Sequence, residues 1–138
     1  MRRTLACVLL LSTALVTPIY ADFYDGLRAY DAKDYATAVS EWQTAANSGD
    51  AKAQYRLGQL YQQGLGVAQN YVEAHRWYSL AAMQGHEEAR DARNALAEKM
   101  SAEQVAEAQE LASTWEPKAP EADQAPAKAE PAQPELGP

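Results

Sequence analysis

Cysteine is almost absent from this sequence. Cys7 is the only one among 138 residues, so the chain can form no internal disulfide. The two histidines, His75 and His86, lie eleven residues apart and lack the i, i+4 partner or the Cys and carboxylate spacing that a metal site requires. We therefore expect no metal, no cofactor and no disulfide framework.

Long apolar runs are also scarce, and the single one lies at the N-terminus. Two arginines at positions 2 and 3 precede an apolar stretch over residues 5–16, and Pro18 and Ala21 follow it. This is the layout of a secretory signal peptide, and the run is shorter than the roughly 20 apolar residues that span a membrane. We expect residues 1–21 to be a signal peptide cleaved near Ala21. An uncleaved N-terminal anchor is the alternative.

Basic residues are fewer than acidic ones, with 12 Lys and Arg against 19 Asp and Glu. Because residues 1–21 hold two arginines and no acid, their removal takes the net charge from −7 to −9. Nucleic acids and anionic membranes attract basic patches. We therefore expect no nucleic-acid partner, no membrane insertion after cleavage, and a location in the periplasm or outside the cell.

Proline is missing between Asp22 and Trp115 but frequent after it. Residues 116–138 contain six prolines, six alanines and five acids, and Leu136 is their only large apolar residue. Such a stretch cannot bury enough apolar area to offset its ordering entropy. We expect a disordered tail that serves as a spacer or solubilising segment, with a proline-rich ligand as the alternative.

The proline-free middle, residues 22–115, has 94 residues and 20 alanines and contains an internal repeat. A shift of 36 residues superposes many similar positions in one register, which indicates a duplicated unit. The superposed pairs include Asp34 with Asn70, Tyr35 with Tyr71, Ala38 with Ala74, Trp42 with Tyr78, Ala45–Ala46 with Ala81–Ala82, Gly49 with Gly85 and Ala53 with Ala89.

Each unit is predicted to form two antiparallel helices. Apolar residues recur at helical spacing, Asn70 and Ser101 are positioned as helix caps, and Gly85 as a helix end. Gly58 is expected to mark a close helix–helix approach, and the aromatic residues are expected to fill the core. We predict an all-α, right-handed αα-solenoid of about three antiparallel helix pairs, with helices at residues 22–32, 35–48, 51–63, 71–84, 87–99 and 102–115.

A family resemblance rests on the stretch from Ala51 to Ala89. It reads Ala-Lys-Ala-Gln-Tyr-Arg-Leu-Gly-Gln-Leu-Tyr-Gln-Gln-Gly-Leu-Gly-Val, followed by Ala74, Trp77–Tyr78, Ala81–Ala82 and Gln84–Gly85. This stretch resembles a full Sel1-like repeat (SLR), a relative of the tetratricopeptide repeats. Arg93 and Asn94 depart from the pattern, since they stand at the positions of Leu57 and Gly58 and suit a polar cap at the end of the stack. The resemblance implies an adaptor or regulator in a protein assembly, and in exported bacterial members a role in the cell envelope.

Catalytic constellations are not evident in the sequence. Ser101 is interpreted as a helix cap because no nucleophile elbow surrounds it, and the acids lie mostly at helix starts and on polar faces. His75 is expected on the solvent face of its helix, and His86 is expected to cap the helix that follows it. We predict no catalytic residue and no enzymatic activity.

The candidate binding residues are surface side chains on the first helix of each predicted pair, which lines the concave face of tetratricopeptide-like stacks. Arginines there could bind carboxylates of an extended partner, although a solvated face paired with nearby acids is the alternative. Tyr55 is exposed only if the predicted helix phase is correct, and otherwise packs inward. The candidate protein-binding residues are Arg28, Gln54, Tyr55, Arg56, Gln59, Gln63, Arg90 and Arg93.

The leading hypothesis is a periplasmic adaptor or regulator that binds a segment of an unidentified protein partner in this groove. A self-associating structural protein of the envelope is the alternative. A hydrolase acting on cell-wall material or β-lactams is less favoured, because no nucleophile with a base is evident. Fold by analogy does not by itself fix function.

Overall fold

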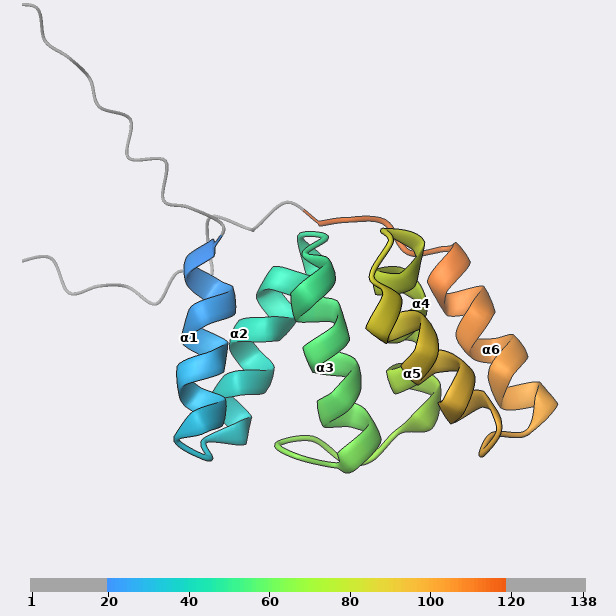
Figure 1. Ribbon diagram of the computed structural model, residues 1–138, viewed down its shortest axis with the longest axis horizontal. Helices are drawn as coiled ribbons and strands as arrows, with labels where there is room; N and C mark the ends of the chain where they lie inside the picture. Colours follow the sequence, from blue (N-terminus) through green and yellow to red (C-terminus); the bar gives the residue numbers. More distant parts are fainter. Residues whose placement is uncertain (1–19, 119–138) are drawn as a thin grey trace, which may run out of the picture.

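The computed structural model describes residues 20–118, which form six helices and no strand (Figure 1). The predicted all-α solenoid is confirmed, with small differences at the helix ends. None of the helices in this range has the length and apolar character needed to cross a bilayer. Residues 1–19 of the predicted signal peptide and residues 119–138 of the predicted tail lie outside the described residues, whereas Tyr20 and Ala21 belong to the first helix. The helices are α1 (Tyr20–Asp31), α2 (Tyr35–Asn47), α3 (Ala51–Gln63), α4 (Tyr71–Met83), α5 (Glu87–Ala97) and α6 (Ala102–Ser113).

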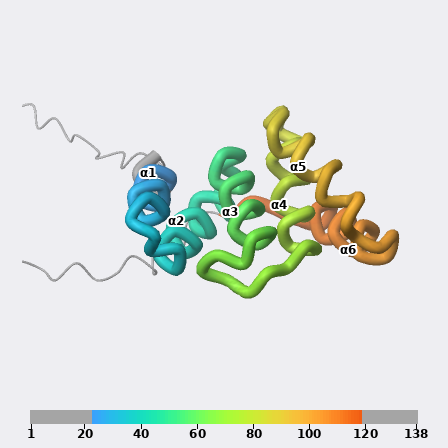
Figure 2. Tube along the Cα trace, turned by 60° about the horizontal axis from the view of Figure 1, so that its bottom comes forward, coloured from blue at the N-terminus to red at the C-terminus, as the bar shows by residue number. Residues whose placement is uncertain are grey.

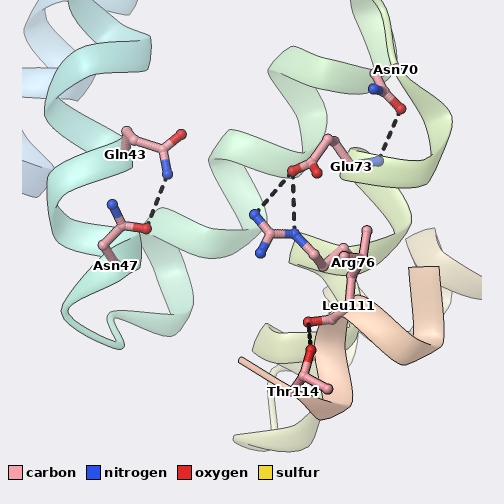
Figure 3. Close-up of polar contacts among 7 residues, drawn as sticks. All are labelled: Gln43, Asn47, Asn70, Glu73, Arg76, Leu111 and Thr114. Atoms are coloured by element: carbon pink, nitrogen blue, oxygen red, sulfur yellow. Dashed lines mark hydrogen bonds and ion pairs between the residues drawn. The ribbon is translucent and has the colours of Figure 1, made fainter. Parts of the chain in front are cut away.

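The start of each helix from α2 to α6 is fixed by the side chain of the residue before it. Ser101 forms a full capping box, since the Gln104 N–H donates to its Oγ at 3.2 Å and its own N–H donates to Gln104 Oε1 at 3.0 Å. Asn70 caps α4 in one direction only: it accepts from the Glu73 N–H at 3.1 Å, while the Glu73 carboxylate pairs with Arg76 (Figure 3). These caps satisfy backbone donors that a helix leaves unpaired at its start.

Glycines with positive φ lie at the ends of α3 and α4, and Gly85 confirms the helix end predicted there. Gly64 has φ +68°, and Gly85 has φ +92°. Gly66, with φ +71°, meets a second constraint, because a Cβ on it would lie 2.4 Å from the carbonyl oxygen of Tyr35. The α3–α4 turn therefore lies directly against the start of α2, and glycine is required there by both conformation and space.

The core consists of two clusters of buried residues. The first cluster centres on Trp42 and Trp77, and the second centres on Tyr78 between α3, α4 and α5. Alanines make up half or more of the residues in each cluster, which lets the backbones approach closely. The first cluster contains Ala38, Trp42, Ala45, Ala46, Ala53, Leu57, Leu60, Trp77, Leu80 and Ala112, and the second contains Ala74, Tyr78, Ala81, Ala89 and Leu96.

The predicted close approach at Gly58 is confirmed. A Cβ on this residue would lie 2.6 Å from Cε1 of Tyr78 and 3.3 Å from the carbonyl oxygen of Ala74. The α3 backbone therefore sits directly on the Tyr78 ring. The missing side chain of Gly58 sets the distance between α3 and α4.

The third unit, formed by α5 and α6, does not repeat the close packing of the second unit, formed by α3 and α4. α6 packs mainly against α4, and its backbone makes little contact with that of α5 (Figure 2). Arg93 and Asn94 of α5 stand where α3 has Leu57 and Gly58. A long charged side chain and an amide at these positions cannot form the close contact that glycine permits, so α6 is displaced onto α4.

A short segment, residues 114–118, returns from the end of α6 along the ends of the preceding helices (Figure 1). We call it the return segment. Trp115 packs against the first core cluster, and the N–H of Lys118 donates to the carbonyl oxygen of Asn47 at 2.8 Å. The return segment thus connects the third unit directly to the end of α2 in the first unit, which is formed by α1 and α2.

Candidate functional site

The outward face of α3 is a polar stripe without an acidic residue. Lys52 and Gln63 are exposed, and Arg56 and Gln59 are half-buried between them. These four residues follow one another at intervals of three or four, so they share one side of the helix. We call them the α3 stripe. A helix without acids stands out in a chain with 19 Asp and Glu.

The prediction for one candidate binding residue of α3, Gln54, is wrong. Gln54 was expected to face outward, but its side chain is fully buried. Its amide donates to the carbonyl oxygen of Ala46 at 3.2 Å and accepts from Gln84 Nε2 at 2.9 Å. Gln54 is therefore a buried polar connection between the ends of α2 and α4. It offers no surface to a partner.

Tyr55 packs inward at the edge of the α3 stripe, as the alternative for this residue foresaw. It is half-buried, and its ring stacks on that of His86 with centroids 4.8 Å apart. Gln59 Nε2 donates to the Tyr55 hydroxyl at 3.0 Å, and Arg56 donates to Gln59 Oε1 at 3.3 Å. These contacts connect the guanidinium on α3 to the imidazole at the start of α5, which gives this edge a defined side-chain arrangement.

His86 performs the predicted cap. The N–H of Ala89 donates to its Nδ1 at 3.3 Å, and Glu88 Oε2 lies 3.3 Å from the same nitrogen. The ring is therefore held by contacts on α5 and by Tyr55 on α3. His86 therefore holds the start of α5 against α3.

The four predicted arginines have different partners in the fold. Arg28 pairs with Asp25, and Arg90 lies 4.0 Å from Glu87, as expected for a solvated face with nearby acids. Arg93 donates to the side chain of Asn94 and lies beside α4 and α6. Among the salt bridges found within residues 20–118, none involves Arg56. Of these arginines, Arg56 is the one on the α3 stripe, and its hydrogen-bond partner is the neutral amide of Gln59.

A pocket that the sequence did not reveal lies between α4, α5 and α6. It has a volume of about 190 Å³ and a largely apolar surface. The departure of Arg93 and Asn94 from the repeat pattern was the available signal, because it predicts that α6 cannot pack on α5 as α4 packs on α3. The lining residues are Ser79, Met83, Arg93, Gln109, Ala112 and Ser113.

His75 is also placed differently from the prediction. It was expected to face solvent but is 2% exposed. Ser79 Oγ lies 3.4 Å from its Nδ1, yet the Ser79 hydroxyl donates to the His75 carbonyl oxygen at 2.8 Å. The serine proton is therefore committed to the backbone, and the arrangement does not activate a nucleophile.

The pKa of His75 is lowered from its ordinary value of 6.5, first because burial disfavours the charged ring and second because Arg93 is positively charged. Burial also raises the pKa of Tyr61 and of Tyr78. The three groups are consequently neutral near pH 7. Within residues 20–118, no group of three His, Cys, Asp or Glu side chains is arranged to hold a metal ion.

Acidification should destabilise the fold through His75. Below pH 6.5 the unfolded chain binds a proton on this ring more readily than the folded chain does, so the free energy of unfolding falls as pH decreases toward the lowered pKa. His75 lowers the free energy of unfolding by at most about 1.4 kcal/mol for each pH unit of acidification, and it adds no pH dependence above pH 6.5. Urea unfolding between pH 7.5 and 5.5 measures it.

The matched variant is His75→Gln, which removes the titrating group. It should be less stable at pH 7.5 and should show a flatter pH dependence than the parent chain. Equal slopes for the two proteins would assign the acid sensitivity to other groups.

Comparisons with known proteins show what this geometry is similar to. A model of the Sel1 repeat matches residues 51–86, which form α3, α4 and the turns around them. A crystal structure of a protective antigen of uropathogenic Escherichia coli, described as displaying an SLR fold, is similar with a TM-score of 0.68 and 29% identity. The similarity covers 71% of this chain and 22% of that one.

Two curated relatives are similar over shorter stretches. Chitin synthase regulatory factor 3 of Schizosaccharomyces pombe is 50% identical over 46 residues, which are 33% of this chain and 5% of that protein. DAP3-binding cell death enhancer 1 of Rattus norvegicus is 42% identical over 58 residues, which are 42% of this chain and 11% of that protein. The chain thus spans only a small part of each, and the similarity concerns the repeat.

Proposed function

Residues 51–86 of this chain are a Sel1 repeat within an all-α solenoid, and from this we propose that the chain is a non-catalytic adaptor or regulator that binds a segment of a protein partner. Sel1 repeats are protein-interaction modules, and proteins that contain them bind protein partners. The proposal further places the chain in the periplasm, on the layout of residues 1–21.

The observation that carries the binding proposal is the α3 stripe. Its members are Lys52, Arg56, Gln59 and Gln63, which offer two cations and two amides on a helix without acids. Arg56 is oriented by Gln59, and Gln59 by Tyr55. An oriented guanidinium with no carboxylate partner among the salt bridges of residues 20–118 suits recognition of acidic side chains on an extended segment.

The amides of the stripe complement this charge. Gln59 and Gln63 can both donate to and accept from the backbone of an extended segment. The partner segment is therefore expected to be acidic and to lie along α3. Six short helices provide only a modest surface, so an affinity near the micromolar range, about −8 kcal/mol, is expected.

Crosslinking of the tagged full-length chain in intact cells, followed by mass spectrometry, tests this function. One dominant envelope protein is expected with the parent chain, and the tag should be found in the periplasmic fraction. Arg56→Glu should lower the yield of that protein at least tenfold, because it removes a charge-assisted hydrogen bond worth about 1.5–3 kcal/mol.

Arg28→Glu is the matched control, since it changes the net charge equally at an exposed arginine on α1 that already has an acidic partner. It should leave the yield close to that of the parent chain. Circular dichroism verifies that both variants keep their helical content. A partner that is retained by Arg56→Glu, or no reproducible partner at all, would contradict binding at the α3 stripe.

A further inference from the structure

The pocket between α4, α5 and α6 exists because the third unit lacks the close packing of the second. On α3, Gly58 allows the backbone to lie against Tyr78. On α5, Asn94 occupies the corresponding position and is exposed. α6 therefore lies mainly on α4, and a volume of about 190 Å³ stays open between the three helices.

The pocket has the size and surface of a site for one large apolar side chain. Cavities of about 150 Å³ lined by apolar groups bind benzene in proteins, so a volume of about 190 Å³ can accept a phenyl ring or a leucine side chain. Ala112 is a buried lining residue, and Met83 is 72% exposed. A flexible methionine at such a place can adapt its shape to different apolar groups.

A positive charge adjoins this apolar space. Arg93 lines the pocket and is half-buried, and its Nε and Nη2 both donate to Asn94 Oδ1, at 3.2 and 3.1 Å. The ion pairs found within the described residues include none with Arg93. His75 of α4, whose pKa is lowered by burial and by the charge of Arg93, is neutral near pH 7. A carboxylate could therefore pair with Arg93 without displacing an acid of this chain.

We propose that this pocket binds a large apolar side chain of a partner protein, with a neighbouring acidic residue of the same partner paired to Arg93. The proposal rests on the function as a protein-binding module but concerns a surface separate from the α3 stripe. The expected anchor of the partner is a phenylalanine or leucine next to a glutamate or aspartate. Apolar anchors in pockets commonly dominate the energy of protein interfaces.

The test is a titration of the full chain with blocked tetrapeptides, in which NMR monitors the ¹³C-labelled methyl group of Met83. Gly-Glu-Phe-Gly is expected to shift this signal with a millimolar dissociation constant. Gly-Gln-Phe-Gly should bind about five- to tenfold more weakly because it lacks the charge, and Gly-Glu-Ala-Gly should cause no shift. A Met83 signal unmoved by any peptide at millimolar concentration would overturn the proposal.

Two variants of α5 identify the source of charge selectivity. Arg93→Gln should bind the Glu and Gln peptides equally, whereas Arg90→Gln, at an exposed arginine of the same helix, should keep the difference. Equal selectivity loss in both variants would show that the general charge of α5 is responsible and would overturn the role of Arg93. Arg56→Glu should leave peptide binding unchanged, which separates this site from the α3 stripe.

A final variant tests whether a segment of this chain, rather than a partner, occupies the pocket. Leu136 is the only large apolar residue of residues 116–138, and Glu135 precedes it. If Leu136→Ser leaves the peptide affinity unchanged, the pocket is free for a partner, as proposed. A severalfold increase in affinity would assign the pocket to the chain's own tail and overturn the assignment to a partner.

Discussion

Replacing Trp42 with alanine is expected to lower the free energy of unfolding by about 3–5 kcal/mol, the range found for buried aromatic residues truncated to alanine. Trp42 is fully buried in the first core cluster. Its Nε1 donates to the carbonyl oxygen of Phe23 at 3.0 Å, and its ring lies 5.7 Å from that of Tyr30. Both contacts belong to α1, so the substitution also detaches α1 from α2. Urea unfolding followed by circular dichroism measures the loss.

The neighbouring residue Gln43 supplies the control. It is half-buried, and its amide donates to Asn47 within the same helix (Figure 3). Gln43→Ala should change the free energy of unfolding by less than about 1 kcal/mol, because a single local hydrogen bond contributes little. Trp42→Phe should be intermediate, since it keeps a ring but loses the donor to Phe23. A Trp42→Ala variant as stable as Gln43→Ala would show that α1 is held by other contacts.

Replacing Gly58 with leucine is expected to cost about 3 kcal/mol or more, at the upper end of measured overpacking effects. Even the first added carbon would lie 2.6 Å from the Tyr78 ring, and the rest of the side chain has no space between α3 and α4. Leucine favours a helix over glycine by nearly 1 kcal/mol, so the observed loss is already reduced by that amount. Thermal or urea unfolding provides the measurement.

Ala95→Leu, at an exposed position of α5, controls for the general effect of a leucine and should stay within about 0.5 kcal/mol of the parent chain. The double variant Gly58→Leu with Tyr78→Ala tests the cause. If the clash with Tyr78 is responsible, the two substitutions together should destabilise less than the sum of their separate effects. Strict additivity would place the strain of Gly58→Leu elsewhere.

The helices were predictable because their signals are local. Asn70, His86 and Ser101 fix helix starts through hydrogen bonds to residues three positions later, and such spacings are visible in a sequence. Gly64 and Gly85 end helices through a backbone conformation that glycine adopts readily. The repeat in one register then indicated the order of packing, with Gly58 at a close contact.

The errors concern polar residues on buried faces. Gln54 and His75 are polar by type, so both were assigned to the surface. In the fold, Gln54 is satisfied by Ala46 and Gln84, residues 8 and 30 positions away, and His75 of α4 is 2% exposed. Helical phase alone would have placed Gln54 inward, since it lies three residues before Leu57.

The candidate site was predictable only in part. Arg56, Gln59 and Gln63 lie on the surface of α3, where their spacing indicated. Sequence alone does not separate Arg56 from Arg28 and Arg90, because the acidic partners of Arg28 and Arg90 depend on side-chain geometry. The pocket beside Arg93 arises from the displacement of α6 onto α4, which is a tertiary effect. Its position could be inferred only from a departure from the repeat.

The return segment has a consequence for how such a protein can evolve. Repeat arrays usually gain or lose units by in-frame duplication, because each unit contacts only its neighbours. Here Lys118 bonds to Asn47 of α2 after a segment of only a few residues from the end of α6. An additional 36-residue unit inserted between them would carry α6 away from α2, and the segment would no longer span the distance. Within residues 20–118, the hydrogen bond between Lys118 and Asn47 therefore opposes the insertion of a further unit, so a descendant with more repeats would first have to lose it.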